Sequence, residues 1–306
     1  MNWQSLRNLR ASYVASEGYL EDYWTPSLLE DYHKSLGQRI FWKWESVLGL
    51  LRLSDLVDDD NNYSLLDMAC GTGVASQSVL ESFPDSKPRD LYLWDRSSKA
   101  QSFAKKKSSE FLAAGNIHCS LPKQVDLGLV SHVLTEMNEG QLQSFLNVLS
   151  SCESFIWVDA GTSFVSERLI KVRDYFLERS YHVHAPCTHQ EACGMTSAGN
   201  EHNWCHFFAD VPGEVHQSAY WREFAKELKV DLRSLPLSFL VMSRKDALTQ
   251  QESISRLIGR VREYKGYCKA LTCDGAGVEE RQIQKRDDKR LFKNLCKGGF
   301  CASLSN

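Results

Sequence analysis

The stretch Leu65-Leu66-Asp67-Met68-Ala69-Cys70-Gly71-Thr72-Gly73 decides the fold, because it joins an apolar run to a glycine turn and a helical pattern. The run from Tyr63 to Ala69 predicts a buried strand, and Val74 to Phe83 predicts the helix that follows it. In a doubly wound parallel sheet, a turn of this kind lies at the carboxyl edge, where ligands bind. Gly71 and Gly73 would let the backbone approach a ligand closely, with their amides available as donors.

Short apolar runs alternate with helical stretches after this turn. They predict further buried strands at Leu91–Trp94, Val125–Val133, Phe155–Val158 and Leu237–Met242. The spacers are long enough for crossover helices, and Phe164–Arg179 is one of them. The alternation predicts an α/β fold, a parallel sheet with helices on both faces.

The chain is expected to contain an N-terminal helical region (1–60), a Rossmann-like core (61–280), a Cys/His-rich metal-binding insertion within that core (182–216) and a basic C-terminal tail (281–306). Helices are predicted at Ser27–Leu36 and Ile40–Leu51 in the first region. The charged, turn-rich run Asp58–Asn62 marks the boundary before the core.

The composition is that of an ordinary globular protein. With 42% hydrophobic and 25% charged residues in 306, extended disorder is disfavoured, and no apolar run approaches the ~20 residues of a membrane span. The N-terminus lacks an apolar signal core, and Glu17, Glu21 and Asp22 argue against a transit peptide. These features predict a cytoplasmic protein with no membrane partner, or a mitochondrial one if a transit peptide has been trimmed.

The charge is unevenly distributed along the chain. Residues 256–297 contain 12 Lys or Arg against 6 Asp or Glu, so this segment carries +6 although the whole chain carries −3. A basic end on an acidic body favours an anionic partner. The cations that follow the last predicted strand could track a phosphate backbone, or they could be a solvated helix face.

The glycine turn has an acidic partner at the end of the next predicted strand. Asp95 comes 22 residues after Gly73, and a carboxylate there can accept both hydrogen bonds of a ribose diol. A dinucleotide-binding dehydrogenase would prefer the spacing G-x-G-x-x-G, but position 76 is Ser and position 69 is Ala. A nicotinamide cofactor is therefore disfavoured.

The turn resembles the first motif of class I methyltransferases that use S-adenosylmethionine. The resemblance implies that Asp67, Ala69, Gly71 and Gly73 form the cofactor loop, which faces the methionine portion, and that Asp95 holds the ribose. The strand ending at Ser131 would bring groups near the donor methyl and the acceptor. His132 or Glu136 could serve there as a base by residue type, and neither is assigned a catalytic role.

The cysteines gather in the irregular stretch. Cys187, Cys193 and Cys205 follow the spacing C-x5-C-x11-C, with five His between His182 and His206. Thiols and imidazoles in a segment with little regular structure favour a metal over a disulfide with a spare thiol. A local His as fourth ligand would indicate zinc, whereas a distant fourth Cys would indicate an iron–sulfur cluster.

A closer resemblance rests on four motifs together. They are Cys187-Thr188-His189, Trp204-Cys205-His206-Phe207, Asp159-Ala160-Gly161-Thr162 and the run from Lys265-Gly266 to Cys273. This combination resembles the methyltransferase-like family of small-ribosomal-subunit assembly factors, found on mitochondrial ribosomes and in bacterial relatives. The resemblance implies a [4Fe-4S] cluster held by Cys187, Cys193, Cys205 and Cys273. Cys268 could substitute for the last of these, and the roles of Cys119, Cys152, Cys296 and Cys301 are open.

The same resemblance predicts the place of the last strand. In a methyltransferase sheet the final strand, here Tyr267–Cys273, runs antiparallel to the others, so Cys273 would lie at the edge opposite the cofactor loop. The expected cluster is then mainly structural.

The function expected from these features is that of an S-adenosylmethionine-binding, methyltransferase-like protein. It would carry an iron–sulfur site and act on or with small-subunit ribosomal RNA in ribosome assembly. Two alternatives are a non-catalytic RNA-binding assembly factor with a vestigial fold, and a small-molecule or protein methyltransferase with structural zinc. The sequence does not indicate the methyl acceptor or the oligomeric state.

Overall fold

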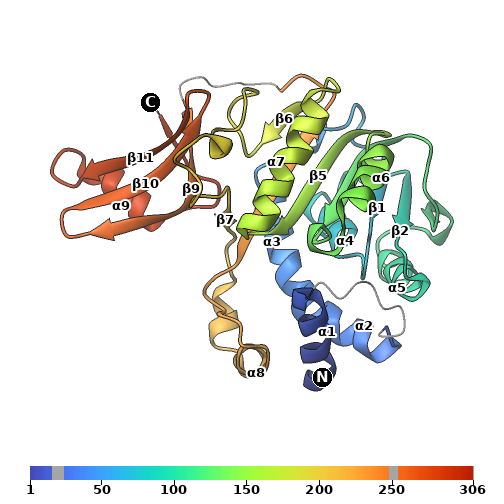
Figure 1. The fold of residues 1–306 in the computed structure, drawn as a ribbon. Helices are drawn as coiled ribbons and strands as arrows, with labels where there is room; N and C mark the ends of the chain where they lie inside the picture. The colour runs from blue at the N-terminus through green and yellow to red at the C-terminus, as the bar shows by residue number, and fades with distance from the viewer. Residues whose placement is uncertain (16–23, 248–253, 306) are drawn as a thin grey trace. The chain divides into compact units, whose positions relative to one another are not determined.

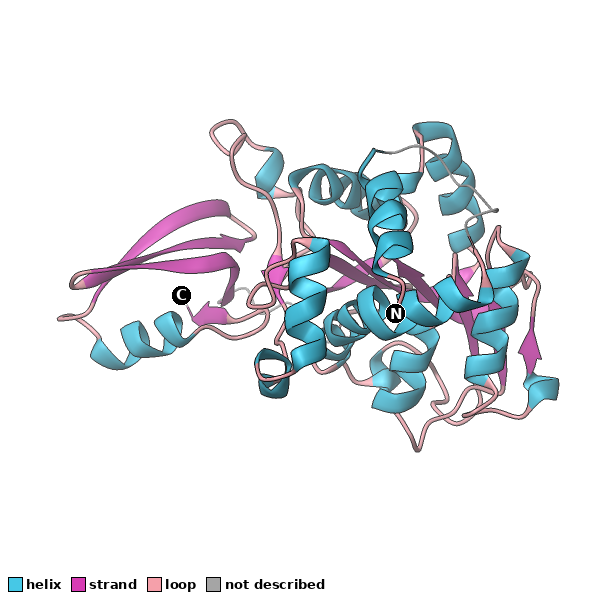
Figure 2. Ribbon diagram, turned by 90° about the horizontal axis from the view of Figure 1, so that it is seen from below, coloured by secondary structure: helices cyan, strands magenta, loops and turns pink. Residues whose placement is uncertain are grey.

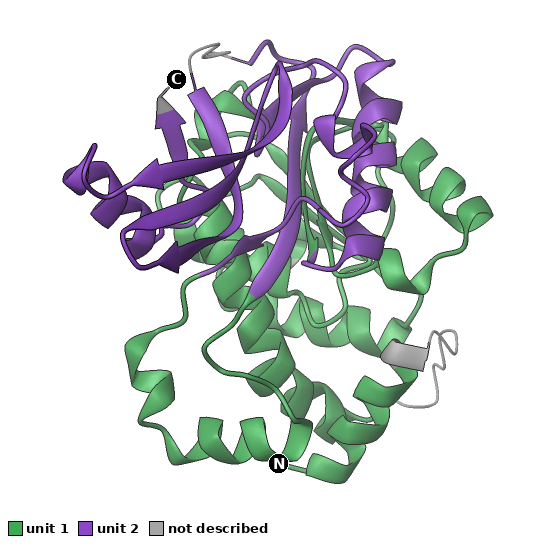
Figure 3. Cartoon of the chain, turned by 60° about the vertical axis from the view of Figure 1, so that its left-hand side comes forward, with its two compact units in different colours: residues 1–159, 210–235 green, residues 160–209, 236–306 purple. Residues whose placement is uncertain are grey.

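The computed structural model describes residues 1–15, 24–247 and 254–305 (Figure 1). Glu17, Glu21 and Asp22 lie outside these ranges. The chain forms two compact units, coloured separately in Figure 3: unit 1 comprises residues 1–159 and 210–235, and unit 2 comprises residues 160–209 and 236–306. Over the described residues, the helices are too short or too polar to cross a membrane.

Unit 1 contains a parallel sheet in the order β3-β2-β1-β4-β5. Its strands are β1 (Ser64–Met68), β2 (Asp90–Trp94), β3 (Ile117–His118), β4 (Val125–Ser131) and β5 (Cys152–Ala160). Every residue of β1 is buried, as an apolar strand in the middle of a covered sheet should be. The predicted parallel α/β sheet is thus confirmed.

Helices alternate with these strands, namely α4 (Val74–Ser82), α5 (Ser98–Ser108) and α6 (Glu139–Leu149). Two of them, α5 and α6, begin with a side-chain cap. The Ser97 side chain accepts a hydrogen bond from the amide of Ala100, and Asn138 and Gln141 form a capping box. These caps fix where each helix begins after the carboxyl end of a strand.

The remaining helices of unit 1 come from both ends of its sequence. They are α1 (Trp3–Ala15), α2 (Pro26–Tyr32), α3 (Gln38–Leu48) and α8 (Ala219–Leu228). Pro26 stands in the first turn of α2 with Thr25 as its N-cap. The chain then continues as a π-helix over His33–Gly37, so the predicted Ser27–Leu36 helix is two elements.

Unit 2 begins with α7 (Ser163–Leu177), which confirms the helix predicted at Phe164–Arg179. The strand β8 (Pro236–Ser243) pairs antiparallel with β6 (His182–Ala185) and with β7 (Phe207–Phe208). The cysteine-rich stretch between β6 and β7 contains only one short 3-10 turn at Gly194–Thr196. Its shape therefore depends on tertiary contacts.

A second, four-stranded antiparallel sheet completes unit 2 in the order β11-β10-β9-β12. Its elements are β9 (Ile254–Tyr264), β10 (Tyr267–Asp274), β11 (Gly277–Gln284), α9 (Lys289–Lys297) and β12 (Ser303–Ser305). Figure 2 shows α9 along one face of this sheet, where its Phe292 and Leu295 pack on Leu257, Cys268 and Ala270. The segment 281–306 was expected as a basic tail, and its described part, residues 281–305, contains the end of β11, α9 and β12.

The predicted position of the last strand is wrong. Tyr267–Cys273 does form a strand, β10, but β10 belongs to the small sheet and pairs with its chain neighbours β9 and β11. The reason is local: only two residues, Lys265 and Gly266, connect β9 to β10, and Gly266 adopts the positive φ of +92°. A connection this short makes an antiparallel hairpin and leaves no room for a crossover.

Candidate functional site

The glycine turn after β1 has the conformation that its sequence requires. Gly71 and Gly73 have φ values of +51° and +77°, and Ala69 has +60° although it carries a side chain. A Cβ added to Gly73 would lie 3.0 Å from the Cβ of Ala104, whereas a Cβ on Gly71 would meet no atom within 4 Å. Gly73 therefore permits close packing of α4 on α5, and Gly71 faces open space.

Asp95 closes the turn from the neighbouring strand. Its Oδ2 accepts a hydrogen bond from the amide of Gly71 at 2.8 Å, and its Oδ1 accepts one from the amide of Ser97 at 2.8 Å. Burial raises the pKa of Asp95, while these two amide bonds act in the opposite direction. Asp95, the residue predicted to bind the ribose, thus lies beside the glycine turn.

Asp67 supports the turn from below. It is fully buried, and its Oδ2 accepts a hydrogen bond from the amide of Ser76 in the first turn of α4 at 3.0 Å. Burial raises the pKa of Asp67 to about 7. Its role in the described structure is to tie α4 to the end of β1.

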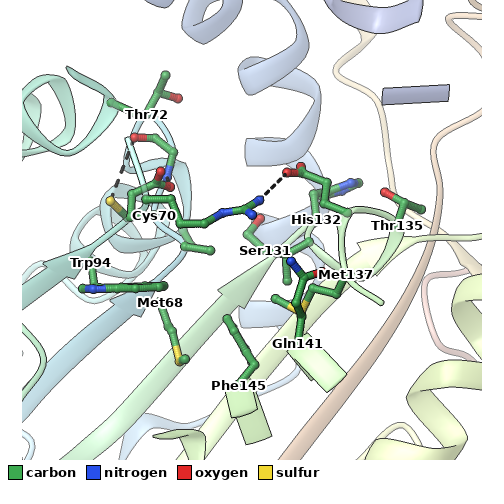
Figure 4. A pocket seen from close by; sticks show the side chains of 18 of the residues that line it. Met68, Cys70, Thr72, Trp94, Ser131, His132, Thr135, Met137, Gln141 and Phe145 are labelled. Atoms are coloured by element: carbon green, nitrogen blue, oxygen red, sulfur yellow. Dashed lines mark hydrogen bonds and ion pairs between the residues drawn. The ribbon is translucent and has the colours of Figure 1, made fainter. Parts of the chain in front are cut away.

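A cavity of about 600 Å³ opens at the carboxyl ends of β1, β2 and β4. Ala69, Gly71, Asp95 and Ser131 line it together, and Figure 4 shows Cys70, Trp94, Ser131 and His132 around the same space. The volume lies in the range of small-molecule sites. With the exception of Gly73 and Asp67, which pack behind the turn, the structure brings the predicted cofactor residues to one cavity.

A buried lysine contacts His132, one of the residues that line the cavity. Lys43 of α3 is 8% exposed, and its Nζ lies 3.2 Å from Nε2 of His132, a cavity-lining residue with the unusual φ of +52°. Burial lowers the pKa of Lys43 to about 7 and lowers the pKa of His132, in part through the charge on Lys43. A strained backbone and a buried amine beside a cavity are typical of functional sites.

Glu136 is another polar residue that lines the cavity. Burial raises its pKa to about 7, and Arg96, 3.7 Å from its Oε2, acts in the opposite direction. Both side chains line the cavity. The two residues that sequence reasoning offered as bases, His132 and Glu136, therefore share one site, but neither contacts a reacting group in the described structure.

The four cysteines of the predicted metal site all lie in unit 2 and act on one another electrostatically. Burial raises the pKa of the Cys205 thiol well above its usual range, and the nearby charges of Cys187, Cys193 and Cys273 raise it further. The pKa of Cys273 rises to about 12 for the same reasons. Four sequence segments thus bring their thiols close enough to repel one another when ionised.

Arg173 of α7 reaches this cysteine group. It is 2% exposed, and its Nη2 donates to the carbonyl of Glu191 at 2.5 Å. Burial alone would lower the pKa of Arg173, but the charge of Cys187 and a hydrogen bond to that thiol raise it. Cys301, buried with a φ of +50°, also acts electrostatically on Cys205.

All ten cysteines are free thiols in the described structure. Across residues 1–15, 24–247 and 254–305, no three His, Cys, Asp or Glu side chains come close enough to hold a metal ion. Cys268 is fully buried on the α9 side of β10, beside Cys296. Because strand neighbours alternate between faces, Cys268 does not share a face with Cys273 and is a poor substitute for it.

Sequence reasoning missed Lys43, Arg173 and Cys301. Lys43 carried a signal, because it is a charged residue inside the apolar run Ile40–Leu51. Arg173 gave none, since charged residues are ordinary on a helix and only the fold shows that it points inward. The position of Cys301 depends on how β12 returns to the small sheet.

A parallel sheet with a glycine turn after β1 and a carboxylate after β2 defines a Rossmann-like fold of the type found in methyltransferases. Residues 43–298 match the family described as mitochondrial small ribosomal subunit Rsm22, and the chain belongs to this family. The family resemblance read from the glycine and cysteine motifs is thereby confirmed. No curated protein matches the chain.

Similar solved structures include TrmK of M. capricolum in complex with S-adenosyl-homocysteine, 11% identical over 62% of this chain and 65% of that one, with a TM-score of 0.34. A methyltransferase from Aquifex aeolicus is 15% identical over 54% and 92%, with a TM-score of 0.38. Precorrin-6y C5,15-methyltransferase from Geobacter metallireducens is 13% identical over 65% and 87%, with a TM-score of 0.38. Similarities of this size carry no argument about ligand or substrate.

Proposed function

We propose that this protein binds S-adenosylmethionine in the cavity of unit 1 and acts on or with the RNA of the small ribosomal subunit during assembly. The observation that carries the cofactor proposal is the Asp95 carboxylate, fixed beside the glycine turn by the amides of Gly71 and Ser97. A carboxylate held in this way suits the two hydroxyls of a ribose. The open space at Gly71 and the cavity volume fit the rest of such a cofactor.

S-adenosylmethionine would supply an electrophilic methyl group in this cavity. Asp95 would orient the ribose, and the turn Ala69–Gly73 would hold the methionine portion. Ser131 and His132 line the same cavity at the end of β4 and would face the acceptor. The Lys43–His132 pair is suited to hold a proton there, because both groups are buried and a charge on Lys43 disfavours a charge on His132.

The second part of the proposal is a [4Fe-4S] cluster in unit 2, with zinc as the alternative metal. Cys187, Cys193, Cys205 and Cys273 would be its ligands, since their thiols gather from separate segments. A thiolate donor set suits both metals. Arg173 supports the assignment, because a buried guanidinium that hydrogen-bonds a thiol offsets the negative charge of a thiolate group.

The partner follows from the family and from charge. The family is described as part of the mitochondrial small ribosomal subunit, and residues 256–297 carry a net charge of +6. Cations gathered in this way favour a phosphate backbone. The same description supports a mitochondrial location over the cytoplasmic one expected from the sequence.

Crosslinking in cells followed by RNA sequencing tests the partner and the substrate together. The expected result is enrichment of small-subunit ribosomal RNA with the tagged protein, and recovery of proteins or metabolites alone would refute the ribosomal proposal. Calorimetry with S-adenosylmethionine tests the cavity separately. Binding without methyl transfer to the crosslinked RNA would favour a non-catalytic assembly factor.

A further inference from the structure

The small sheet of unit 2 has two different faces. One packs on α9 through Cys268, Ala270 and their neighbours. The other presents Arg262 and Tyr264 from β9 opposite Lys269 and Tyr267 from β10, because Tyr264 pairs with Tyr267 and Arg262 with Lys269. Side chains opposite one another in an antiparallel pair lie on the same face. We call this second surface, with Gln282 and Gln284 of β11, the tyrosine face.

The two tyrosines form a flat aromatic step at the hairpin tip. Their rings are 4.8 Å apart and nearly parallel, at 9°, and Tyr264 is 42% exposed. Stacking against each other leaves the outer ring surface of the exposed member available to a further planar group.

Charge on this face favours an anion. Arg262 and Lys269 lie beside the tyrosines, Lys265 stands in the exposed turn, and Glu280 is the carboxylate that pairs with Arg262 and Lys269. Arg262 keeps 57% of its side chain exposed despite that pair. The combination of π surface and cations matches the way single-stranded nucleic acids are bound, with bases on aromatic rings and phosphates along cations.

We propose that the tyrosine face binds unpaired bases of RNA, with a base stacking on the Tyr264–Tyr267 step. This inference rests on the proposed ribosomal RNA partner and specifies where and in which form that RNA is held. An A-form duplex hides its base faces, so an aromatic step at a sheet surface selects single strands. On the other side of the sheet, the aromatic residue of α9 is Phe292, which is buried against the sheet, so the cations of α9 would contact phosphates only.

Fluorescence anisotropy of the full-length protein tests the proposal with a labelled single-stranded RNA and a base-paired hairpin of equal length. Tyr264→Ala/Tyr267→Ala should weaken single-strand binding by about tenfold or more, as expected for a lost stacking contact, and should leave hairpin binding unchanged. Tyr264→Phe/Tyr267→Phe keeps both rings and should retain wild-type affinity. Lys289→Ala/Lys293→Ala on α9 should weaken both RNAs alike and reduce the salt slope by about 1.4 for the single strand.

Three outcomes overturn the proposal. The first is unchanged single-strand binding by the alanine pair, and the second is an equal loss in the phenylalanine pair. The third is binding to poly-glutamate with no binding to either RNA, which would assign the face to an acidic protein. If the wild type binds neither RNA, the ribosomal partner itself fails, whereas wild-type binding with unaffected tyrosine variants refutes only the tyrosine face.

A crosslinking measurement keeps the test valid if the alanine pair folds poorly. Wild-type protein irradiated with RNA that contains 4-thiouridine should yield crosslinked peptides that carry Tyr264 or Tyr267. Crosslinks confined to α9 peptides would contradict the proposal.

Discussion

The amide of Gly71 donates a hydrogen bond to Oδ2 of Asp95 at 2.8 Å, so the glycine turn and the end of β2 are held together before any ligand binds. One carboxylate therefore has two tasks: it fixes the turn and it remains at the edge of the cavity. Preorganisation of this kind reduces the ordering cost of binding.

Asp95→Ala should weaken S-adenosylmethionine binding by about ten- to a hundredfold, because hydrogen bonds to a charged group contribute more than neutral ones. Isothermal titration calorimetry measures the change. Asp85→Ala, at an exposed position of the same unit, is the matched control and should bind as the wild type does. Tight binding by the Asp95 variant would refute the ribose assignment.

Cys273→Ser should abolish the metal centre, whereas Cys268→Ala should keep it, because the two side chains lie on opposite faces of β10. Absorption at about 400 nm after anaerobic purification, together with iron and zinc analysis, distinguishes the two metals. Equal metal content in both variants would contradict the proposed ligand set. Loss of stability in Cys268→Ala without loss of metal is expected, since that thiol is fully buried in a core.

Arg173→Gln should shorten the lifetime of the metal centre in air, because the thiolates lose a buried cation that offsets their charge. Arg173→Lys keeps the positive charge, so its metal centre should have a lifetime between those of the wild type and Arg173→Gln. Arg179→Gln is the control near the end of the same helical segment, where the side chain is 43% exposed. Bleaching followed at about 400 nm gives the lifetimes, and identical decay in the Gln variants would remove the role given to Arg173.

Lys43 should make stability depend on pH. Burial lowers its pKa from 10.5 to about 7, so between these values the unfolded chain binds a proton that the folded chain lacks. The free energy of unfolding should therefore rise with pH, by roughly 3–5 kcal/mol from pH 7 to pH 10.5. The loss of stability caused by burying the Lys43 amine is fully present below pH 7.

Lys43→Met should remove this rise and increase stability at neutral pH. Urea unfolding of both proteins across the window measures the difference, with the exposed Lys106→Met as control. A rise of equal size in wild type and Lys43→Met would show that another group is responsible.

The sequence predicted the parallel sheet because its strands are buried on both faces and read as continuous apolar runs, of which Leu65–Met68 is the clearest. The cofactor residues could also be predicted, because the glycine turn comes directly after one strand and Asp95 comes directly after the next. The small antiparallel sheet was not predicted from the sequence, because β9 and β11 are largely polar on one face and show no continuous apolar run. The Tyr264–Tyr267 step depends on hairpin register, which spacing alone does not give.

The sequence also did not predict the side chains that reach each site from helices distant in sequence. Lys43 meets His132 only because α3 packs near the end of β4, and Arg173 meets Cys187 only because α7 places it inward. Such meetings depend on tertiary packing between segments that are distant in sequence.

The proposed metal ligands are spread along the chain, and the last of them, Cys273, lies on β10, well after the cofactor cavity is complete. During synthesis, the nascent chain would acquire its S-adenosylmethionine site first and its fourth thiol much later. A product of premature termination between residues 235 and 273 would contain all of unit 1 and lack the fourth thiol. Metal occupancy would then report that translation of the protein has run to completion.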